Sequence, residues 1–527
     1  MILGPASPDA PHGTAERTTL DDLFHRAAER RPDAAAVIDP PNRQGFAAGP
    51  PRTLTYAEAD RMVSGIARRL RRLGLPPDSV IGVQLPNTVE SALTLLGVLR
   101  AGMIASPLPL LWRRKDAIAA LTMIGAKALI TCPHVDATDH CDLAMHVAAE
   151  VFTIRHVCAF GATVPDGFVP LEDLYGKTDA AVEPIAPVDR TGNPADHVAV
   201  ITWDVDATGP VPVARKHSEL LAGGFSVFSE AAMSQDAVIL STLLSASFAG
   251  LALTIVPWLI AGGTLVLHHP FHAAVLATQR AKYKCTTVVL PGPLAARLAE
   301  ARLLGADSGL VSVVGAWRAP ERMLVSPTWR EGDVRLVDVQ AFGEVGIVAA
   351  RRGGDGHPAL IGPGRLITPR GSPSGVVVAE LARGEDGTLL MRGPMVPRHP
   401  FPPGIERSGT SYLRVGDDGF VDTGYTCRID RDSGRLMVTR PPGGMVSIGG
   451  YRFLLRDLQD IVAATSAGAT LAGLPDTLSG HRLAGAAPNR EALIAELVSL
   501  GLNPLVANAF RERRTADQPA VREASAA

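Results

Sequence analysis

VIGVQLPNTVESALTLLGVLRAGMIAS, residues 80–106, contains a complete strand–helix–strand unit. Residues 80–85 form a short, continuously apolar run that is typical of a strand buried on both faces. A helix capped at Asn87 or Thr88 follows, and a glycine ends it before a second apolar strand at 103–106. Two such strands joined by a helix are the building unit of a parallel α/β sheet.

The same alternation continues along the chain. A helix is predicted over 116–124 and a strand over 126–131, and a second alternating block runs from about 197 to 350. Repeats of this kind predict mostly parallel sheets with helices on both faces. From 351 to 440 the chain consists of short β-rich pieces separated by Gly, Pro and Asp. Beyond residue 440 lies a short α+β segment whose last clear helix is expected at 491–500.

The predicted fold class is therefore α/β, with a large N-terminal domain of two α/β subdomains and a small, shortened α+β C-terminal domain. The predicted bounds are 1–440 for the N-terminal domain, with a β-rich subdomain at about 351–440, then 441–510 for the C-terminal domain and 511–527 for a tail expected to be disordered.

The composition argues against several classes of function. The 51 Lys and Arg residues balance 53 Asp and Glu residues, so no net field draws the chain to nucleic acid or to an anionic membrane. The 5 cysteines form no CxxC pair, which suits reduced thiols in a cytoplasmic protein and argues against structural zinc. The N-terminus lacks a basic region followed by an apolar run, so no signal peptide is expected.

Residues 237–267 carry no charged side chain, and their length would permit a membrane span. Pro257 and the pair Gly262 and Gly263 interrupt this run, and both of its ends resemble strands. We therefore expect a buried strand–helix–strand unit here and no transmembrane helix.

Six stretches in order resemble the adenylate-forming superfamily of acyl-CoA synthetases, nonribosomal-peptide adenylation domains and luciferases. They are LTYAEADRMVSGIARRLRRLG, VQLPNTVESALTLLGVLRAGMIASPLPL, FGEVG, LLMRGP, GFVDTGYTCRID and GGYRFLLRDLQD, and the resemblance extends from about residue 18 to about residue 510. It implies that the large domain joins ATP and a carboxylic acid into an acyl-adenylate and releases pyrophosphate. The small domain then rotates, and a thiol such as CoA accepts the acyl group.

The phosphate-binding loop of that family corresponds to WDVDATGPVPVARKH, residues 203–217, and it is only partly retained. The matching residues are Thr208, Gly209 and Pro212, whereas Asp204 and Asp206 replace hydroxyl or glycine residues. Two carboxylates repel a triphosphate, so a surface turn that leads into the next helix is favoured over phosphate binding. Arg215 and Lys216 are displaced substitutes for the family's loop lysine.

The family's metal-binding motif, aromatic-Gly-x-Thr-Glu, corresponds to FGEVG. Phe342, whose family counterpart stacks on adenine, and Gly343 match. Val345 and Gly346 replace the Thr and the Glu, and Glu344 lies two residues away from the position of the metal ligand. Because Mg²⁺ prefers several oxygen ligands, the sequence predicts no metal site.

The family's ribose-binding Thr-Gly-Asp is Thr423, Gly424 and Tyr425 in this chain. Loss of two charge-assisted hydrogen bonds, at about 1.5–3 kcal/mol each, would lower nucleotide affinity about 10²- to 10⁴-fold. Tyr425 either projects into the space of the ribose or packs as a half-buried aromatic with its hydroxyl at the rim.

The family's catalytic lysine near the end of the small domain has no counterpart, because the last lysine of the chain is Lys284. The late cations are arginines, at positions 511, 513 and 514, and a guanidinium does not simply replace a flexible ammonium. Arg428 and Arg440 match family arginines and are either functional or structural. Candidates for an acid- or acyl-binding pocket are Ser245, Gly315 and Trp317.

Three interpretations follow. In the first, the chain is an AMP-dependent synthetase/acyl-CoA ligase homologue that is catalytically impaired or inactive and binds an acyl or CoA-like ligand or a protein partner. In the second, it is an active acid–thiol ligase that uses ATP, Mg²⁺ and CoA, with Arg215 or Lys216 on the phosphates and Glu344 on the metal. In the third, it is a scaffold with an empty cleft, and a homodimer is one of its candidate forms.

Overall fold

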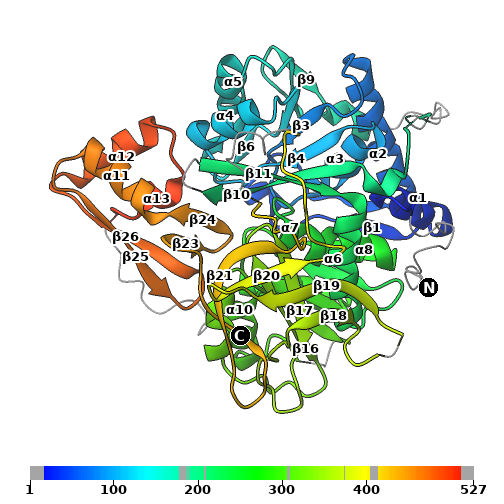
Figure 1. Cartoon of the computed structure of the whole chain (residues 1–527). Coiled ribbons are helices and arrows are strands. Elements are labelled where there is room, and N and C mark those ends of the chain that lie inside the picture. The colour runs from blue at the N-terminus through cyan, green and yellow to red at the C-terminus, as the bar shows by residue number, and fades with distance from the viewer. Residues whose placement is uncertain are drawn as a thin grey trace, which may run out of the picture.

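The computed structural model of the chain describes residues 17–176, 185–186, 188, 190–206, 209–305, 309–372, 374–403 and 413–511. Within these residues the strands form four larger sheets and one two-stranded hairpin (Figure 1). The architecture is the predicted mixed α/β fold. Thr208, Arg513, Arg514 and the tail from 512 onward lie outside the described residues.

The largest sheet has the strand order β17-β16-β15-β14-β12-β13-β1-β2. Its strands are β17 (Gly346–Arg351), β16 (Arg335–Phe342), β15 (Ser312–Trp317), β14 (Thr287–Pro291), β12 (Val238–Ser241), β13 (Thr264–Leu267), β1 (Ala35–Ile38) and β2 (Thr53–Thr55). The inner pairs are parallel, and the end pairs β16–β17 and β1–β2 are antiparallel. The accompanying helices are α1 (Leu20–Arg30), α2 (Tyr56–Arg72), α6 (His217–Glu230), α7 (Phe248–Gly250), α8 (Val256–Ala261), α9 (Ala273–Tyr283) and α10 (Gly292–Glu300).

The second sheet has the order β11-β10-β4-β3-β5-β8-β9. Its strands are β11 (Gly209–Lys216), β10 (Val198–Asp206), β4 (Ile104–Pro107), β3 (Val80–Val83), β5 (Ala128–Thr131), β8 (His156–Ala159) and β9 (Phe168–Pro170), and its helices are α3 (Val89–Arg100), α4 (Arg114–Met123) and α5 (His140–Glu150). The two strands of the opening sequence are β3 and β4, and they pair in parallel as predicted. The small hairpin is β6 (His134–Val135) and β7 (Thr138–Asp139), and short 3-10 turns cover Arg43–Gly45, Glu172–Tyr175, Pro194–Asp196 and Pro320–Val325.

The third and fourth sheets are antiparallel. The third consists of β18 (Gly364–Thr368), β19 (Val376–Arg383), β20 (Thr388–Arg392), β21 (Val421–Ile429) and β22 (Leu436–Arg440). The fourth has the order β24 (Tyr451–Leu454), β23 (Met445–Ile448), β26 (Gly480–Ala486) and β25 (Thr470–Asp476), with helices α11 (Leu455–Thr465), α12 (Arg490–Ser499) and α13 (Pro504–Asn508). Helix α13 was not predicted; Asn503 caps it and Pro504 occupies its first position.

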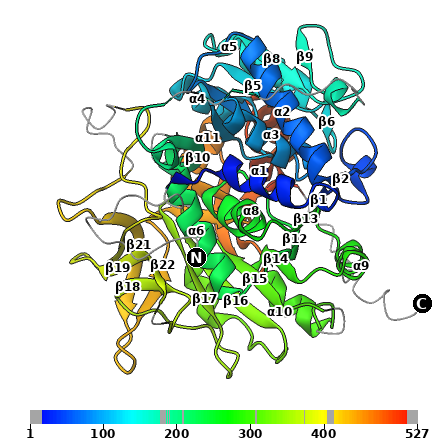
Figure 2. The same cartoon turned by 90° about the vertical axis from the view of Figure 1, so that its right-hand side faces the viewer.

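The two large sheets enclose a shared helical layer. Figure 2 shows α1, α6 and α8 between β5, β8 and β9 on one side and β12 to β17 on the other. A close approach within this layer requires glycine, since a Cβ on Gly223 would collide with Phe248 and one on Gly224 with Val256. The fourth sheet and its helices lie to one side of this body in Figure 1, drawn in orange and red.

The uncharged run 237–267 is the predicted strand–helix–strand unit. It comprises β12, the helical residues 248–261 and β13, and its residue Trp258 is fully buried against Phe24, with ring centroids 5.8 Å apart. Its apolar surface is therefore covered by the protein itself. In the part of the chain that the structure describes, no helix combines the length and the apolar character that crossing a membrane requires.

Candidate functional site

The stretch that corresponds to the phosphate loop is a β-hairpin. Strands β10 and β11 pair along their whole length, with Trp203 opposite Pro212, Asp204 opposite Val211 and Asp206 opposite Gly209. The prediction of a surface turn is wrong for Asp204, because this residue lies within the paired strand β10 and is only 1% exposed. Asp206 lies half-buried at the end of β10, and Gly209 begins β11 with a φ of +111°.

Asp204 is the centre of an internal polar cluster. Its Oδ2 accepts a hydrogen bond from the backbone N of Glu344 at 2.9 Å, and its Oδ1 forms an ion pair with the guanidinium of Arg452. The Asp204 side chain is completely buried, and that of Arg452 is 12% exposed. Gly343, with a φ of +56°, fits beside this pair only because it has no side chain: a Cβ there would collide with both groups. The carboxylate therefore binds groups of the protein itself.

Arg452 comes from β24, so this ion pair connects residues 441–511 to the rest of the chain. Three further contacts lie on the same interface. The backbone N of Leu111 donates to the Tyr451 hydroxyl at 3.0 Å, Arg114 donates to the carbonyl of Ser499 at 3.0 Å, and Arg297 donates to the Thr477 hydroxyl at 2.8 Å. No sequence pattern pointed to Arg452, although it lies within the recognised stretch GGYRFLLRDLQD.

Glu344 is turned into the interior as well. It is 3% exposed, and its Oε2 accepts a hydrogen bond of 2.7 Å from the backbone N of Phe248. Burial raises the pKa of this carboxyl, and Arg215 opposes the rise. A metal ligand needs a carboxylate that faces an accessible space with other oxygen ligands. Among the described residues, no group of three or more His, Cys, Asp or Glu side chains comes together in a metal-binding arrangement.

Arg215, one of the two basic residues at the end of β11, does not face an open cleft either. Arg215 is fully buried, with its guanidinium 3.4 Å from the centre of the Phe248 ring, and it donates to the carbonyls of Met395 at 2.8 Å and Val345 at 3.2 Å. Lys216 is half-buried directly before α6. Arg215 is one of the two residues proposed to replace the family's loop lysine on a phosphate. Its buried position does not agree with that role.

His217, at the end of the same stretch, is 8% exposed, and its Nδ1 accepts a hydrogen bond from the backbone N of Leu20 at 3.2 Å. Burial lowers the pKa of this histidine to about 4, so the ring is neutral in the folded protein at neutral pH. Its role is to join α6 to the start of α1.

Tyr425 packs on Phe342, the residue whose family counterpart stacks on adenine. The two rings meet edge to face, with centroids 5.4 Å apart and planes at 83°, and Tyr425 is 1% exposed. Burial raises the pKa of its hydroxyl to about 12. The expectation of a half-buried ring with its hydroxyl at the rim is wrong, because Phe342 and the Arg452 guanidinium, 5.9 Å from the ring centre, cover it.

Little open space is left beside these side chains. The cavity next to them has a volume of about 50 Å³ and is lined by residues of the hairpin, of FGEVG and of β24, among them Trp203, Asp204, Arg318, Glu344 and Arg452. Sites for ligands of drug-like size usually have about 300–1,000 Å³. The residues present do not fit ATP with Mg²⁺: the ribose carboxylate is replaced by a buried ring, and the remaining carboxylates bind internal N–H groups and an arginine.

Larger spaces lie farther along the same interface. A cavity of about 210 Å³ is lined by Thr242, Leu244 and Tyr451, and one of about 440 Å³ by Arg297, Arg322 and residues 476–480. Arg318 lines all three cavities and donates a hydrogen bond to the Ser247 hydroxyl. Arg318 directly follows the predicted pocket residue Trp317 in the sequence, but its bond to Ser247 has no sequence signal.

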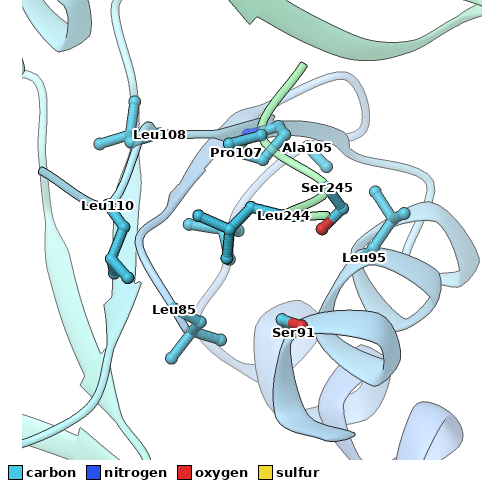
Figure 3. A pocket seen from close by; sticks show the side chains of 11 residues that line it. Leu85, Ser91, Leu95, Ala105, Pro107, Leu108, Leu110, Leu244 and Ser245 are labelled. Atoms are coloured by element: carbon cyan, nitrogen blue, oxygen red, sulfur yellow. The ribbon is translucent and has the colours of Figure 1, made fainter. Parts of the chain in front are cut away.

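The three predicted pocket residues do not share one pocket. Ser245 lines an apolar cavity of about 20 Å³, where Figure 3 shows it with Ser91 among leucines that include Leu85 and Leu244. Trp317 lines the 440 Å³ cavity, with its Nε1 donating to Asp338 at 2.7 Å. Gly315 lies in β15, where a Cβ would come within 3.0 Å of the Gly292 backbone, and it lines none of these cavities.

Two sequence-predicted arginines lie elsewhere. Arg440 ends β22, where its backbone pairs with Thr426, and its side chain is exposed; Arg428 is exposed on the neighbouring strand β21. Neither lines the cavities described above.

Comparison with known proteins assigns the family. The sequence pattern of the AMP-binding enzyme family matches residues 24–398, and the chain belongs to this family. It is 28% identical over 495 residues to the 2-hydroxy-7-methoxy-5-methyl-1-naphthoate–CoA ligase of Streptomyces carzinostaticus, covering 89% of this chain and 84% of that one. It is 27% identical over 489 residues to the salicyl-AMP ligase / salicyl-S-ArCP synthetase of Mycobacterium tuberculosis, covering 89% and 81%.

Among solved structures, the amide bond synthetase McbA of Marinactinospora thermotolerans superposes with a TM-score of 0.69 at 21% identity, covering 93% of this chain and 94% of that one. This likeness supports the fold.

Proposed function

We propose that this protein is an AMP-binding family member that has lost acyl-adenylate formation and that binds a small carboxylic acid or acyl group without activating it. The observation that carries the proposal is the packing of Tyr425 against Phe342, with the Asp204–Arg452 ion pair directly beside it. By the family resemblance, Phe342, Tyr425 and Asp204 correspond to residues that contact adenine, ribose and phosphate, so their contacts with one another and with Arg452 support the proposal.

Movement of the C-terminal segment alone would not reopen this site. Rotation of residues 441–511 would separate Arg452 from Asp204 and enlarge the 50 Å³ cavity. Tyr425 and Phe342, however, belong to β21 and β16 outside that segment, so their contact would persist. The division of the chain at residue 440, between a large N-terminal domain and a small C-terminal domain, is also part of this proposal.

The relatives support a second candidate, an active ligase for an aromatic acid. Both curated relatives are named for acids with a hydroxyl beside the carboxyl group, a 2-hydroxynaphthoate and salicylate, and each aligns with 89% of this chain. The cavity of about 20 Å³ at Ser245 and Ser91 is too small for such an acid, so the relatives alone support this candidate.

Calorimetry and pyrophosphate exchange distinguish these proposals from a scaffold with an empty cleft. The full chain is titrated with ATP and Mg²⁺ at millimolar concentration, and separately with salicylate alone. We expect salicylate binding without detectable ATP binding and without salicylate-dependent exchange. ATP binding with exchange would establish the active ligase instead. Absence of binding for both would support the scaffold, for which a homodimer is a candidate form testable by sedimentation.

Restoring the ribose carboxylate provides a second test. Tyr425→Asp is expected to give no exchange above background, because the metal carboxylate and the C-terminal lysine would still be missing and losses of preorganised groups compound. Appreciable exchange by this variant would contradict the proposed inactivity.

The proposed location is the cytoplasm, since the five cysteines are free and buried.

A further inference from the structure

A cavity of about 290 Å³ lies in a different part of the molecule. Its walls are the segments that follow three neighbouring strands, 85–90 after β3, 132–134 after β5 and 160–163 after β8, together with residues 43–50 and Glu172. Leu85 is its one residue in common with the cavity at Ser245, and it shares none with the three cavities at the interface of residues 441–511.

The topology of the second sheet makes this place a natural binding site. The chain passes from β3 to β4 on one side, then crosses back so that β5 lies on the other side of β3, followed by β8. Because these strands are parallel, the loops after β3 and β5 begin at the same edge of the sheet. The first loop leads to β4 on one side and the second leads towards β8 on the other, so they leave in opposite directions. In open α/β sheets, ligands bind in the crevice at the carboxyl ends of the strands where this reversal occurs.

The usual ligand at such a point is an anion on a helix N-terminus, but here that end is already satisfied. Helix α3 begins at Val89, whose backbone N donates to Asp39 Oδ1 at 2.9 Å, and Glu90 stands in its first turn. Both carboxylates are buried and complement the positive end of the helix. An additional anion would gain little there.

The charges around the cavity leave an excess of negative charge. The carboxylates of Asp39, Glu90 and Glu172 face the guanidiniums of Arg43 and Arg52: Arg43 bonds Asp39 at 2.6 Å and Glu90 at 2.9 Å, and Arg52 pairs with Glu90 and Glu172. Burial, with the neighbouring Glu90, raises the pKa of Asp39 to about 6, so it is ionised at neutral pH. Three carboxylates against two guanidiniums leave one net negative charge.

Two polar groups on the wall have hydrogen-bonding capacity to spare. Arg52 holds Oε1 of Glu172, and among the described residues no donor reaches its Oε2, while the side chain is 25% exposed. Thr88 is 1% exposed and lines the cavity; its side chain does not cap α3, and no partner for its hydroxyl is found in the part of the chain that the structure describes. Because Thr88 lines the cavity, a ligand or a water molecule there can satisfy this hydroxyl.

We propose that this cavity binds a small organic cation, a primary ammonium on an apolar body. The ammonium donates to Glu172 Oε2 and to the Thr88 hydroxyl, and the apolar part lies against Leu85 and Phe160, which line the same cavity. This proposal is independent of the proposed function, since it uses none of the residues at the interface of residues 441–511.

The test uses phenethylammonium as the probe. A neutral analogue, 2-phenylethanol, and an anionic analogue, 3-phenylpropanoate, serve as controls. Binding to the full chain is measured by calorimetry and saturation-transfer NMR. We expect phenethylammonium to bind at least about 10-fold more tightly than either analogue, because only the ammonium can form a charge-assisted hydrogen bond with Glu172. Glu172→Gln should weaken the ammonium about 10-fold and leave the alcohol unchanged. Asp173→Asn is the matched control, because Asp173 is the next residue, is exposed, and pairs with Arg69 instead.

A blocking variant locates the binding. Ala162 lines the cavity and is exposed, so Ala162→Trp should fill the entrance without unfolding the protein, which its melting temperature verifies. Loss of phenethylammonium binding in this variant supports the proposal. Unchanged binding in Ala162→Trp or Glu172→Gln, preference for the propanoate, or no ammonium binding up to about 5 mM would each overturn it.

Discussion

Two regions of the second sheet differ in how their buried polar side chains are bound. At the β10–β11 hairpin, Asp204 is bound by Glu344 N and Arg452, and nearby Tyr425 is covered by Phe342, around a space of only about 50 Å³. At the ends of β3, β5 and β8, Thr88 and one oxygen of Glu172 border a cavity of about 290 Å³. At the hairpin, buried polar side chains bind one another and hold distant segments of the chain together.

The largest effect is expected from breaking the hairpin's central ion pair. Arg452→Ala leaves the fully buried Asp204 carboxylate without its cation, which typically costs about 3–5 kcal/mol. Urea unfolding should show this loss, and residues 441–511 should become more sensitive to limited proteolysis. Arg456→Ala, an exposed arginine in the adjoining helix, is the control. An equal and small effect of both changes would show that the pair does not secure this interface.

A smaller effect, of about 3 kcal/mol, is expected from the pH dependence of His217. The folded protein keeps this ring neutral, with a pKa lowered from 6.5 to about 4, whereas the unfolded chain takes up the proton. The contribution of His217 to the free energy of unfolding is therefore fully present above pH 6.5, and it decreases as the pH drops towards 4. His217→Gln, which retains an acceptor for Leu20 N, should flatten this part of the stability curve.

The control for that experiment is His146→Gln, because His146 is exposed on α5. A curve for His217→Gln that is as steep as that of the unchanged protein would contradict a structural role for the last residue of the hairpin stretch.

Much of the fold could be predicted because it depends on local patterns. The apolar runs before and after α3 became β3 and β4, and the uncharged run 237–267 became a strand, a helix and a strand, since Pro257 and the glycine pair limit what such a run can form. Helix α13 was missed, because a five-residue helix carries too little periodicity.

The site could be predicted only in part, because its contacts join distant segments. The sequence indicated that Asp204 and Tyr425 do not suit a nucleotide, but it gave no sign that Arg452, 248 residues away, is the partner of Asp204. The 290 Å³ cavity likewise depends on β5 crossing to the far side of β3, and strand order is not encoded in any one segment.

The smallest effect is expected from Arg440, which matches a family arginine and yet lies exposed at the end of β22. Surface substitutions away from caps and buried networks usually change stability by less than about 0.5 kcal/mol. Arg440→Ala should therefore match Arg428→Ala, a change of an exposed arginine on the paired strand β21, in urea unfolding and in salicylate affinity. A loss of salicylate binding in Arg440→Ala alone would mean that Arg440 reaches a ligand in another arrangement of residues 441–511, and that this family position acts in ligand binding.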